Sequence, residues 1–391
     1  MKKNKTNKIN NITKCKLLLI EIKSKYIIKK VFENLKTKKF LQIIKYNNRI
    51  SKKIDISLKD SFKKFWIDNQ IEIELNIIEN PEYDEDKKNF INYEKEDEPY
   101  IHIHLNNDKK ETKRNYINKN EALSTVKIIL DLKFKKFLKL FCDCKIIKKI
   151  QFIKFKRDDI INMSEMFSGC ENLTDLDLSN FNTDNVTDME GMFSWSTKLT
   201  YLDLGKFNTK NVTNTRELFW GCWSLKNINL SSFNTDNIKN MKKMFDGCSS
   251  LIELDLKNFN TINVINMEEM FFDCSSIKYL NLKNFKTDNV NDMNNMFAGC
   301  SRLEELDISN FNFNKVRISE NIFNCNSLKK VHIPPSTDAY IKKLIDDILN
   351  KSKIKKGLRH NKNEFMMGEK DEEVIPKNLF FHNFDDEYND F

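Results

Sequence analysis

Residues 241–264 read MKKMFDGCSSLIELDLKNFNTINV, and this arrangement of apolar and polar residues returns every 26 residues. The step is clearest in one phenylalanine column, made of Phe167, Phe193, Phe219, Phe245, Phe271, Phe297 and Phe323. Columns of Met, Cys, Leu and a second Phe keep the same step, so the consensus is M-x-x-M-F-x-x-C-x-x-L-x-x-L-x-L-x-x-F-N-T-x-N-V-x-x. Self-similarity at a fixed period is the sequence signature of a repeat architecture.

Each unit divides into two parts with different periodicity. Met189, Met192, Phe193 and Ser196 have the i, i+3, i+4, i+7 spacing of one helix face, and the Thr187–Asp188 pair before them is a possible N-cap. The Leu-x-Leu part that follows alternates with period two, which is typical of a short strand. We therefore expect an α/β solenoid of strand–turn–helix coils with a parallel sheet, like that of leucine-rich repeats.

The array is predicted to span residues 137–333 as seven full units and a partial one. Stepping back 26 residues from the clear copies gives a degenerate unit that begins at Phe137 and includes Cys144 and Phe152. Terminal units of a solenoid are usually atypical because they cover the end of the stack. This first unit is therefore expected to be an N-terminal capping repeat.

The motif M-x-x-M-F-x-x-C-x-x-L-x-x-L-D-L-S-x-F-N-T-x-N-V resembles the BspA-like leucine-rich repeat family over about half of the chain. The resemblance implies a solenoid fold. It also implies adhesion, since family members are mostly bacterial or protist surface proteins that bind host proteins or other cells. This sequence shows no secretory signal or lipid anchor, a departure from the family's usual location.

Composition and charge favour an intracellular protein. The 391 residues carry a net charge of +9, but residues 1–70 alone hold twenty Lys/Arg against five Asp/Glu. A nucleic-acid binder would spread positive charge over its working face, so nucleic acid is not the expected partner. No apolar run approaches the roughly 18 residues of a membrane span. Five of the nine Cys occupy one repeat position, which indicates buried thiols in a reducing, cytoplasmic compartment.

Two polar columns flank the strand leucines and are candidate partner-binding positions. The candidates among them are Asp177, Asp203, Asp255 and Asp307 in one column, and Tyr201, Glu253, Tyr279 and Glu305 in the other. Alternation places both columns on the outer side of the sheet, where they would form an acidic strip with two tyrosines. One interpretation is a docking face for a basic protein partner. The other is a solvated sheet face whose Asp column belongs to the repeat consensus.

A second candidate is aromatic. Trp195, Trp220 and Trp223 occur in adjacent units at positions that are polar elsewhere, apart from Phe272 in the Trp220 slot. Trp is enriched at binding hot spots, so the three residues are predicted to contact a partner. Local packing against the neighbouring unit is the competing explanation.

The sequence offers no arrangement typical of an enzyme. His102 and His104 share a strand face without a third ligand at a suitable spacing, and Cys142 and Cys144 form C-x-C rather than the C-x-x-C of zinc or redox sites. A Gly-rich phosphate loop and a nucleophile elbow are also missing from the sequence. We expect no catalytic residues, no metal and no cofactor.

The flanking regions suggest a division into five parts. Residues 1–25 are a basic, flexible tail, and residues 26–70 are a helical module whose first half, 26–50, faintly resembles an F-box. Residues 71–136 hold three strand-like runs (71–78, 100–105 and 126–132) separated by charged linkers, and they precede the solenoid at 137–333. Residues 334–391 hold a capping helix from about residue 337 to 350 and an acidic-aromatic tail.

The repeat array predicts a non-catalytic scaffold that binds other proteins through its stacked surface. Two alternatives remain open at this stage. An F-box-like module joined to leucine-rich repeats would be the substrate receptor of a ubiquitin ligase, and an export signal upstream of this sequence would make the chain a surface adhesin.

Overall fold

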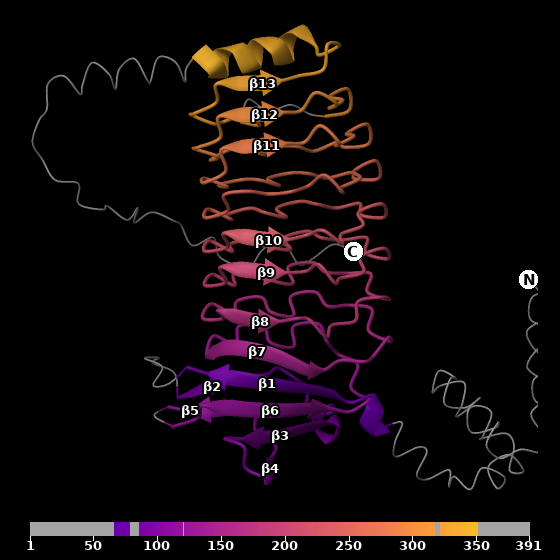
Figure 1. Ribbon diagram of the computed structural model, residues 1–391, viewed down its shortest axis with the longest axis vertical. Helices are drawn as coiled ribbons and strands as arrows, with labels where there is room; N and C mark the ends of the chain where they lie inside the picture. The colour runs from indigo at the N-terminus through magenta and orange to yellow at the C-terminus, as the bar shows by residue number, and fades with distance from the viewer. Residues whose placement is uncertain (1–65, 79–85, 120, 317–320, 351–391) are drawn as a thin grey trace, which may run out of the picture.

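The computed structural model describes residues 66–78, 86–119, 121–316 and 321–350, and shows a β-solenoid of about seven coils stacked in one column (Figure 1). The predicted basic tail at 1–25, the F-box-like segment at 26–50 and the acidic-aromatic tail lie outside these residues. A helix at residues 66–68 precedes the first strand.

Most coils contribute a three-residue strand that pairs in parallel with its neighbours. The strands are β8 (Asp175–Asp177), β9 (Tyr201–Asp203), β10 (Asn227–Asn229), β11 (Tyr279–Asn281), β12 (Glu305–Asp307) and β13 (Lys330–His332). Residues 253–255 of the coil between β10 and β11 form no strand. Parallel pairing joins β9 to β10, with Leu202 opposite Ile228, and joins β11 to β12 and β12 to β13. Equivalent residues 26 positions apart therefore lie side by side, as between Tyr201 and Asn227.

The expected helix in each unit is wrong. Residues 189–195, which carry the Met-x-x-Met-Phe motif, form consecutive tight turns. The amides of Gly191 and Phe193 donate to carbonyls of the next coil, at 2.8 and 3.0 Å, while the amide of Met192 donates to the carbonyl three residues back. An α-helix would use i to i−4 bonds and leave no donor for a neighbour. The predicted N-cap, Asp188, instead accepts the Glu190 amide at 3.1 Å and closes a turn.

Left-handed backbone at two positions of each unit makes these turns possible. The first position includes Gly191 (φ 55°) and Glu217 (φ 57°), and the second includes Gly169, Trp195 and Gly221. An α-helix cannot pass through such residues. The turns nevertheless direct Met163, Met166, Phe167 and Cys170 inward, each 0% exposed, so the predicted apolar face is the core.

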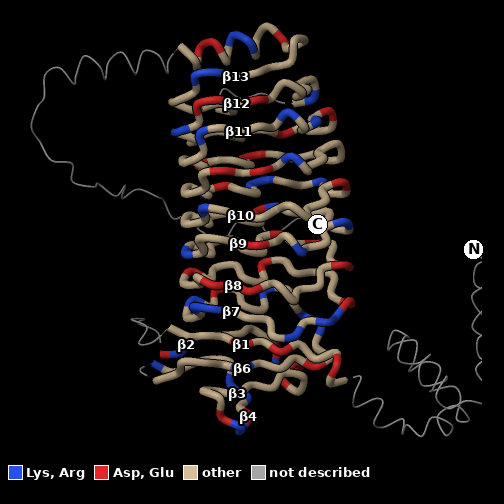
Figure 2. The backbone as a smooth tube through the Cα atoms, in the orientation of Figure 1, with Lys and Arg blue, Asp and Glu red and all other residues tan. Residues whose placement is uncertain are grey.

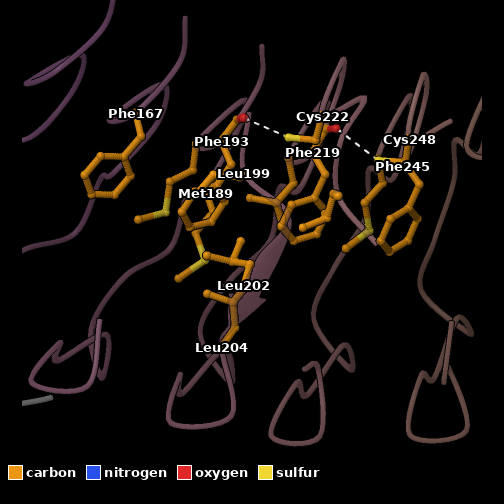
Figure 3. Close-up of a cluster of buried hydrophobic side chains, with 14 of the residues drawn as sticks. Phe167, Met189, Phe193, Leu199, Leu202, Leu204, Phe219, Cys222, Phe245 and Cys248 are labelled. Atoms are coloured by element: carbon orange, nitrogen blue, oxygen red, sulfur yellow. Dashed lines mark hydrogen bonds between the residues drawn. The ribbon is translucent and has the colours of Figure 1, made fainter. Parts of the chain in front are cut away.

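Ladders of identical side chains hold the coils together (Figure 3). The rings of Phe219, Phe245 and Phe271 stack with centroids 5.4 and 5.7 Å apart and interplanar angles of 20° and 2°. Each core thiol donates to a phenylalanine carbonyl of the preceding coil, as Cys222 Sγ does to Phe193 at 3.1 Å. Ser196 fills the slot where Cys is missing and donates the same bond, to Phe167, at 2.9 Å.

Two polar ladders lie along the turns. The buried Thr209 hydroxyl donates to the Asn234 carbonyl at 2.8 Å and accepts the Asn234 amide, and the other threonines of its column repeat the pattern. The turn asparagines donate to a carbonyl of the preceding coil, as Asn211 does to Asp184 at 2.7 Å. Both ladders join consecutive coils through side-chain to backbone hydrogen bonds.

An antiparallel sheet covers the N-terminal end of the stack. Its strands are β1 (Ile71–Ile77), β3 (Ile101–Leu105), β4 (Glu111–Thr112), β6 (Thr125–Leu130) and β7 (Ile147–Lys154), and their order with the first solenoid strand is β4-β3-β6-β1-β7-β8. A separate ribbon pairs β2 (Lys87–Asn89) with β5 (Tyr116–Asn118), and the 3-10 helix η1 (Glu98–Tyr100) precedes β3. The three strand-like runs of the sequence are β1, β3 and β6, and β7 continues the sheet directly into the coils.

A buried arginine joins this sheet to the first coil. Arg157 is 1% exposed, and its guanidinium donates to the carbonyl of Phe134 at 2.7 Å and to the carboxylate of Asp159 at 2.8 Å. Burial lowers its pKa to about 10.

A helix at residues 339–350 closes the C-terminal end, with Ile341 and Ile345 buried against the last coils. The sequence predicted the same helix with a start two residues earlier, at about residue 337. Among the described residues, none of the helices has the length and apolar character needed to cross a bilayer.

Candidate functional site

The three candidate tryptophans form one cluster on two adjacent coils. The ring of Trp195 meets those of Trp220 and Trp223 edge to face, with centroids 5.1 and 5.3 Å apart and interplanar angles of 71° and 74°. Trp195 and Trp220 are half-buried, and Trp223 is 43% exposed. The predicted contact with a partner is not tested by this geometry. We call Trp195, Trp220 and Trp223 the tryptophan corner.

The other coils build the same corner without tryptophan, although Phe272 takes the Trp220 position in one of them. The Trp195 position holds Gly169, Gly221, Gly247 and Gly299 in other units, and the Trp223 position holds Ser249, Ser275 and Ser301. Trp195 itself has φ 56°, a conformation that costs a non-glycine residue about 1–2 kcal/mol. The coil therefore does not need tryptophan to form its turn, and it keeps one there at a backbone cost.

A glycine makes room for the Trp195 ring. A Cβ atom on Gly221 would lie 3.0 Å from Trp195 Cδ2, and Gly221 also has φ 69°. The same device recurs where Asp273 leans over Gly299. Side chains at this position thus lie flat over the next coil. A large residue here therefore requires glycine at the same position of the next coil.

Charged side chains surround the tryptophan corner. The Lys243 ammonium lies over the Trp220 ring, 5.1 Å from its centroid, and pairs with Glu269 at 3.3 Å. Asp246 follows Trp220 in the same column and is only 7% exposed. Burial raises the pKa of Asp246 to about 8, Lys243 opposes this rise, and the carboxylates of Glu269, Asp273 and Glu217 add to it.

Asp246 is a residue that sequence reasoning missed. The available signal was its column, which holds Ser168, Ser194, Trp220, Asp246, Phe272 and Ala298 and so varies more than any core column. Among the described residues, none donates a hydrogen bond to the Asp246 carboxyl or pairs with it at ion-pair distance. Burial also raises the pKa of Asp273, which lies one position further along the next coil.

The strand face carries the other candidates. Tyr201 on β9 and Tyr279 on β11 are 56% and 52% exposed, with Glu253 exposed on a coil between them. Strands in a sheet are about 4.8 Å apart, so three coil steps separate the two tyrosines by about 14 Å. The structure therefore does not bring the tyrosines into contact with each other.

The Asp column has a structural task. Asp177, Asp203, Asp255 and Asp307 each accept the backbone amide two residues later, at 2.9, 2.9, 3.1 and 3.0 Å, and so close the turn after the strand. Asn229 and Asn281 do the same in the remaining coils. The hydrogen bonds from Ser179 lower the pKa of Asp177. The consensus interpretation accounts for these contacts without a partner.

Two of the six acidic candidates in the strip have ion-pair partners. Asp255 pairs with Lys257 at 2.7 Å, and Glu305 pairs with Lys330 at 3.1 Å and with His332 at 2.8 Å. Acidic and basic segments alternate along the stack in Figure 2. A docking face for a basic partner on the strands remains a prediction, and the geometry places fewer unpaired carboxylates there than the sequence suggested.

His102 and the C-x-C cysteines have protein side chains or the core as their neighbours. His102 Nδ1 lies 3.2 Å from Glu111 and its Nε2 lies 3.4 Å from Asp131. In the part of the chain that the structure describes, no group of three or more His, Cys, Asp or Glu residues is arranged to hold a metal ion. Cys144 is buried in the core, and burial raises the pKa of the half-buried Cys142 to about 12.

The repeat region matches a known protein family. The family described as "Mycoplasma protein of unknown function, DUF285" matches residues 135–253 and again residues 222–333. Together these matches span residues 135–333, just over half of the chain. A search of curated proteins found no match.

Proposed function

The chain belongs to this DUF285 family of Mycoplasma proteins of unknown function, and we propose that it is a non-catalytic scaffold that binds other proteins through side chains carried on its coils. A rigid stack of identical coils supplies a regular frame, and residues that differ from coil to coil supply specificity. The resemblance of the repeat to the BspA-like family, whose members bind other proteins, supports the same class of function.

The tryptophan corner carries the proposal. Trp223 exposes 43% of its surface at a position where three other coils use serine, and Trp195 is held at a positive φ where four others use glycine. The left-handed turn itself recurs along the stack, but glycine satisfies it at lower cost, and residues held in such conformations tend to occur at functional sites. Large, rigid indole rings that are partly exposed and already packed together are what hot spots of protein interfaces use.

The thiol ladder supports a reducing compartment as the place of action. Six core thiols donate to backbone carbonyls at 2.9–3.3 Å: Cys170, Cys222, Cys248, Cys274, Cys300 and Cys325. A thiol oxidised to a disulfide would lose its donor hydrogen, so the ladder needs reduced cysteines. We therefore propose that the scaffold acts in the cytoplasm.

Affinity capture with the full chain as bait tests the proposal. The bait is compared with Trp223→Ser, which installs the residue that Ser249, Ser275 and Ser301 have at this position. Captured proteins are identified by mass spectrometry, and the strongest is purified and titrated against both baits. Loss of a hot-spot tryptophan costs about 2 kcal/mol or more, so we expect roughly thirtyfold weaker binding.

A matched control separates this effect from a general loss of exposed apolar surface. Ile161 is 62% exposed outside the tryptophan corner, and the equivalent residues of the next two coils are Thr187 and Thr213. Ile161→Thr should leave binding unchanged, and both variants should keep the melting temperature within a few degrees. Equal binding of Trp223→Ser and the unaltered bait would refute this site.

A further inference from the structure

Some carboxylates near the tryptophan corner have cationic partners and others have none. Glu217 pairs with Arg216 at 2.9 Å, and Glu269 pairs with Lys243 at 3.3 Å. Within the described residues, the carboxyls of Asp246 and Asp273 have neither an ion-pair partner nor a hydrogen-bond donor. Both carboxyls therefore remain uncompensated, and Asp246, which is more than nine-tenths buried, lies one coil from Trp220 in the same column.

The exposed Trp223 ring lies against the coil that carries Asp246. A Cβ on Gly247 would lie 3.5 Å from Trp223 Nε1, so the Trp223 indole lies against the residue that follows Asp246. Asp246 and Trp220 hold the same position in consecutive coils, and the Gly221 amide donates to the Asp246 carbonyl at 2.8 Å. Asp273 holds the Gly247 position one coil further along.

The corner already binds one cation of its own. The Lys243 ammonium lies 5.1 Å from the centre of the Trp220 ring, within the range of a cation–π contact. Trp223 has no such internal cation on it among the described residues and is the most exposed of the three rings. Its π face and the nearby carboxyls attract the same sign of charge.

We propose that the tryptophan corner recognises an arginine side chain of the partner protein, whose guanidinium stacks on Trp223 and lies beside Asp246. Arginine fits better than lysine because its planar group stacks on an aromatic ring while it donates hydrogen bonds from its edge. A guanidinium would supply the donors that the Asp246 carboxyl lacks. This proposal deepens the scaffold function and rests on it, since it names what the partner presents.

The proposal makes binding depend on pH. The groups that face Asp246 are Lys243 from its own coil, Glu217 from the preceding coil, and Glu269 and Asp273 from the next coil. Because the pKa of Asp246 lies at about 8, its carboxyl is protonated at lower pH and ionised above it. Arginine stays charged throughout, so its binding should strengthen between pH 6.5 and pH 9.

The test uses N-acetyl-arginine amide as the probe and N-acetyl-citrulline amide, its uncharged analogue, as the control. Each is titrated into the full-length protein while the indole N–H signals are followed by NMR, with the Trp223 signal assigned from Trp223→Ser. We expect a saturable shift of the Trp223 signal with the arginine probe alone. Asp246→Asn should weaken binding about fivefold, as expected for about 1 kcal/mol, and remove the pH dependence. Folding should tolerate this change because other coils hold Ser or Ala here.

Each outcome decides between the possibilities. Equal shifts with citrulline, or none with arginine, would overturn arginine recognition, and preferential binding of N-acetyl-glutamate amide would assign the corner to an acidic partner. Arginine recognition would fail while the scaffold function stands if Trp223→Ser abolishes partner capture but the arginine probe does not bind. If the arginine probe binds but Trp223→Ser captures partners as well as the unaltered bait does, the proposed scaffold function of this corner fails instead.

Discussion

Truncation of Phe245 should show that the aromatic ladder holds the coils together. Phe245 is 0% exposed and stacks on Phe219 at 5.4 Å and on Phe271 at 5.7 Å. Replacing a buried Phe with Ala removes its transfer free energy and leaves a cavity, at a cost of about 3–5 kcal/mol. Because the ring has a stacking partner on each side, and each such pair contributes about 0.5–1.5 kcal/mol, we expect the upper part of this range.

The end of the ladder provides the comparison. Phe323 is equally buried, at 1%, but among the described residues its ring stacks on one partner, Phe297, at 6.0 Å. Phe323→Ala should therefore cost about 1 kcal/mol less than Phe245→Ala, the worth of one aromatic pair. Urea denaturation of the full chain, followed by tryptophan fluorescence, gives the free energy of unfolding for each variant.

Amide hydrogen exchange locates the damage. In a repeat protein each unit contacts its neighbours, so protection should fall most in the coils of Phe219 and Phe271 and least in the sheet of β1, β6 and β7. A loss under about 1 kcal/mol for Phe245→Ala, or a uniform fall in protection across the chain, would refute the ladder as the main source of coil-to-coil stability.

Three further changes test other contacts. Ser196→Cys should leave the free energy of unfolding within about 0.5 kcal/mol of the unaltered protein, because six coils hold a thiol that donates this bond. Ser196→Ala removes the bond and should cost about 1 kcal/mol. Equal effects of the two variants in urea denaturation would contradict the ladder. Gly299→Ala should lower the melting temperature, since φ is 78° and the new Cβ would lie 1.8 Å from Asp273 Oδ1; adding Asp273→Gly should recover part of the loss, and no loss would refute the steric argument. Asp246→Asn should stabilise the protein at pH 8. Burial raises the pKa of this carboxyl to about 8 in the folded state, so its ionisation above the unfolded pKa of about 4 favours unfolding. The gain in stability should shrink as the pH falls toward 4, and a gain independent of pH would contradict this argument.

The period and the inward-facing residues follow from sequence alone. When units of equal length stack, residues 26 apart superpose, so a column of Phe, Met or Cys lies inside whatever the backbone between them does. This is why Phe167, Met189 and Cys222 were placed in the core correctly, and why the degenerate unit at Phe137 was recognised as the start of the stack. The three tryptophans were grouped by the same reasoning, because Trp195 and Trp220 are only 25 residues apart.

The conformation of the Met-x-x-Met-Phe segment was decided by tertiary structure. Consecutive turns and an α-helix both place i, i+3, i+4 and i+7 on one side, so apolar spacing does not distinguish them. The glycines at 169, 221, 247 and 299 were the available signal, since they permit the positive φ that a helix excludes.

The neighbouring coil resolves this ambiguity. It offers a row of carbonyls at the correct spacing, and alternate amides such as those of Gly191 and Phe193 bond to it rather than to their own segment. The charge state of Asp246 depends on the same assembly, because burial between coils raises its pKa only once they have stacked. The sequence by itself therefore determined the repeat period and the core, while contacts between coils, which form only in the folded stack, decided the turn geometry and the electrostatics of the tryptophan corner.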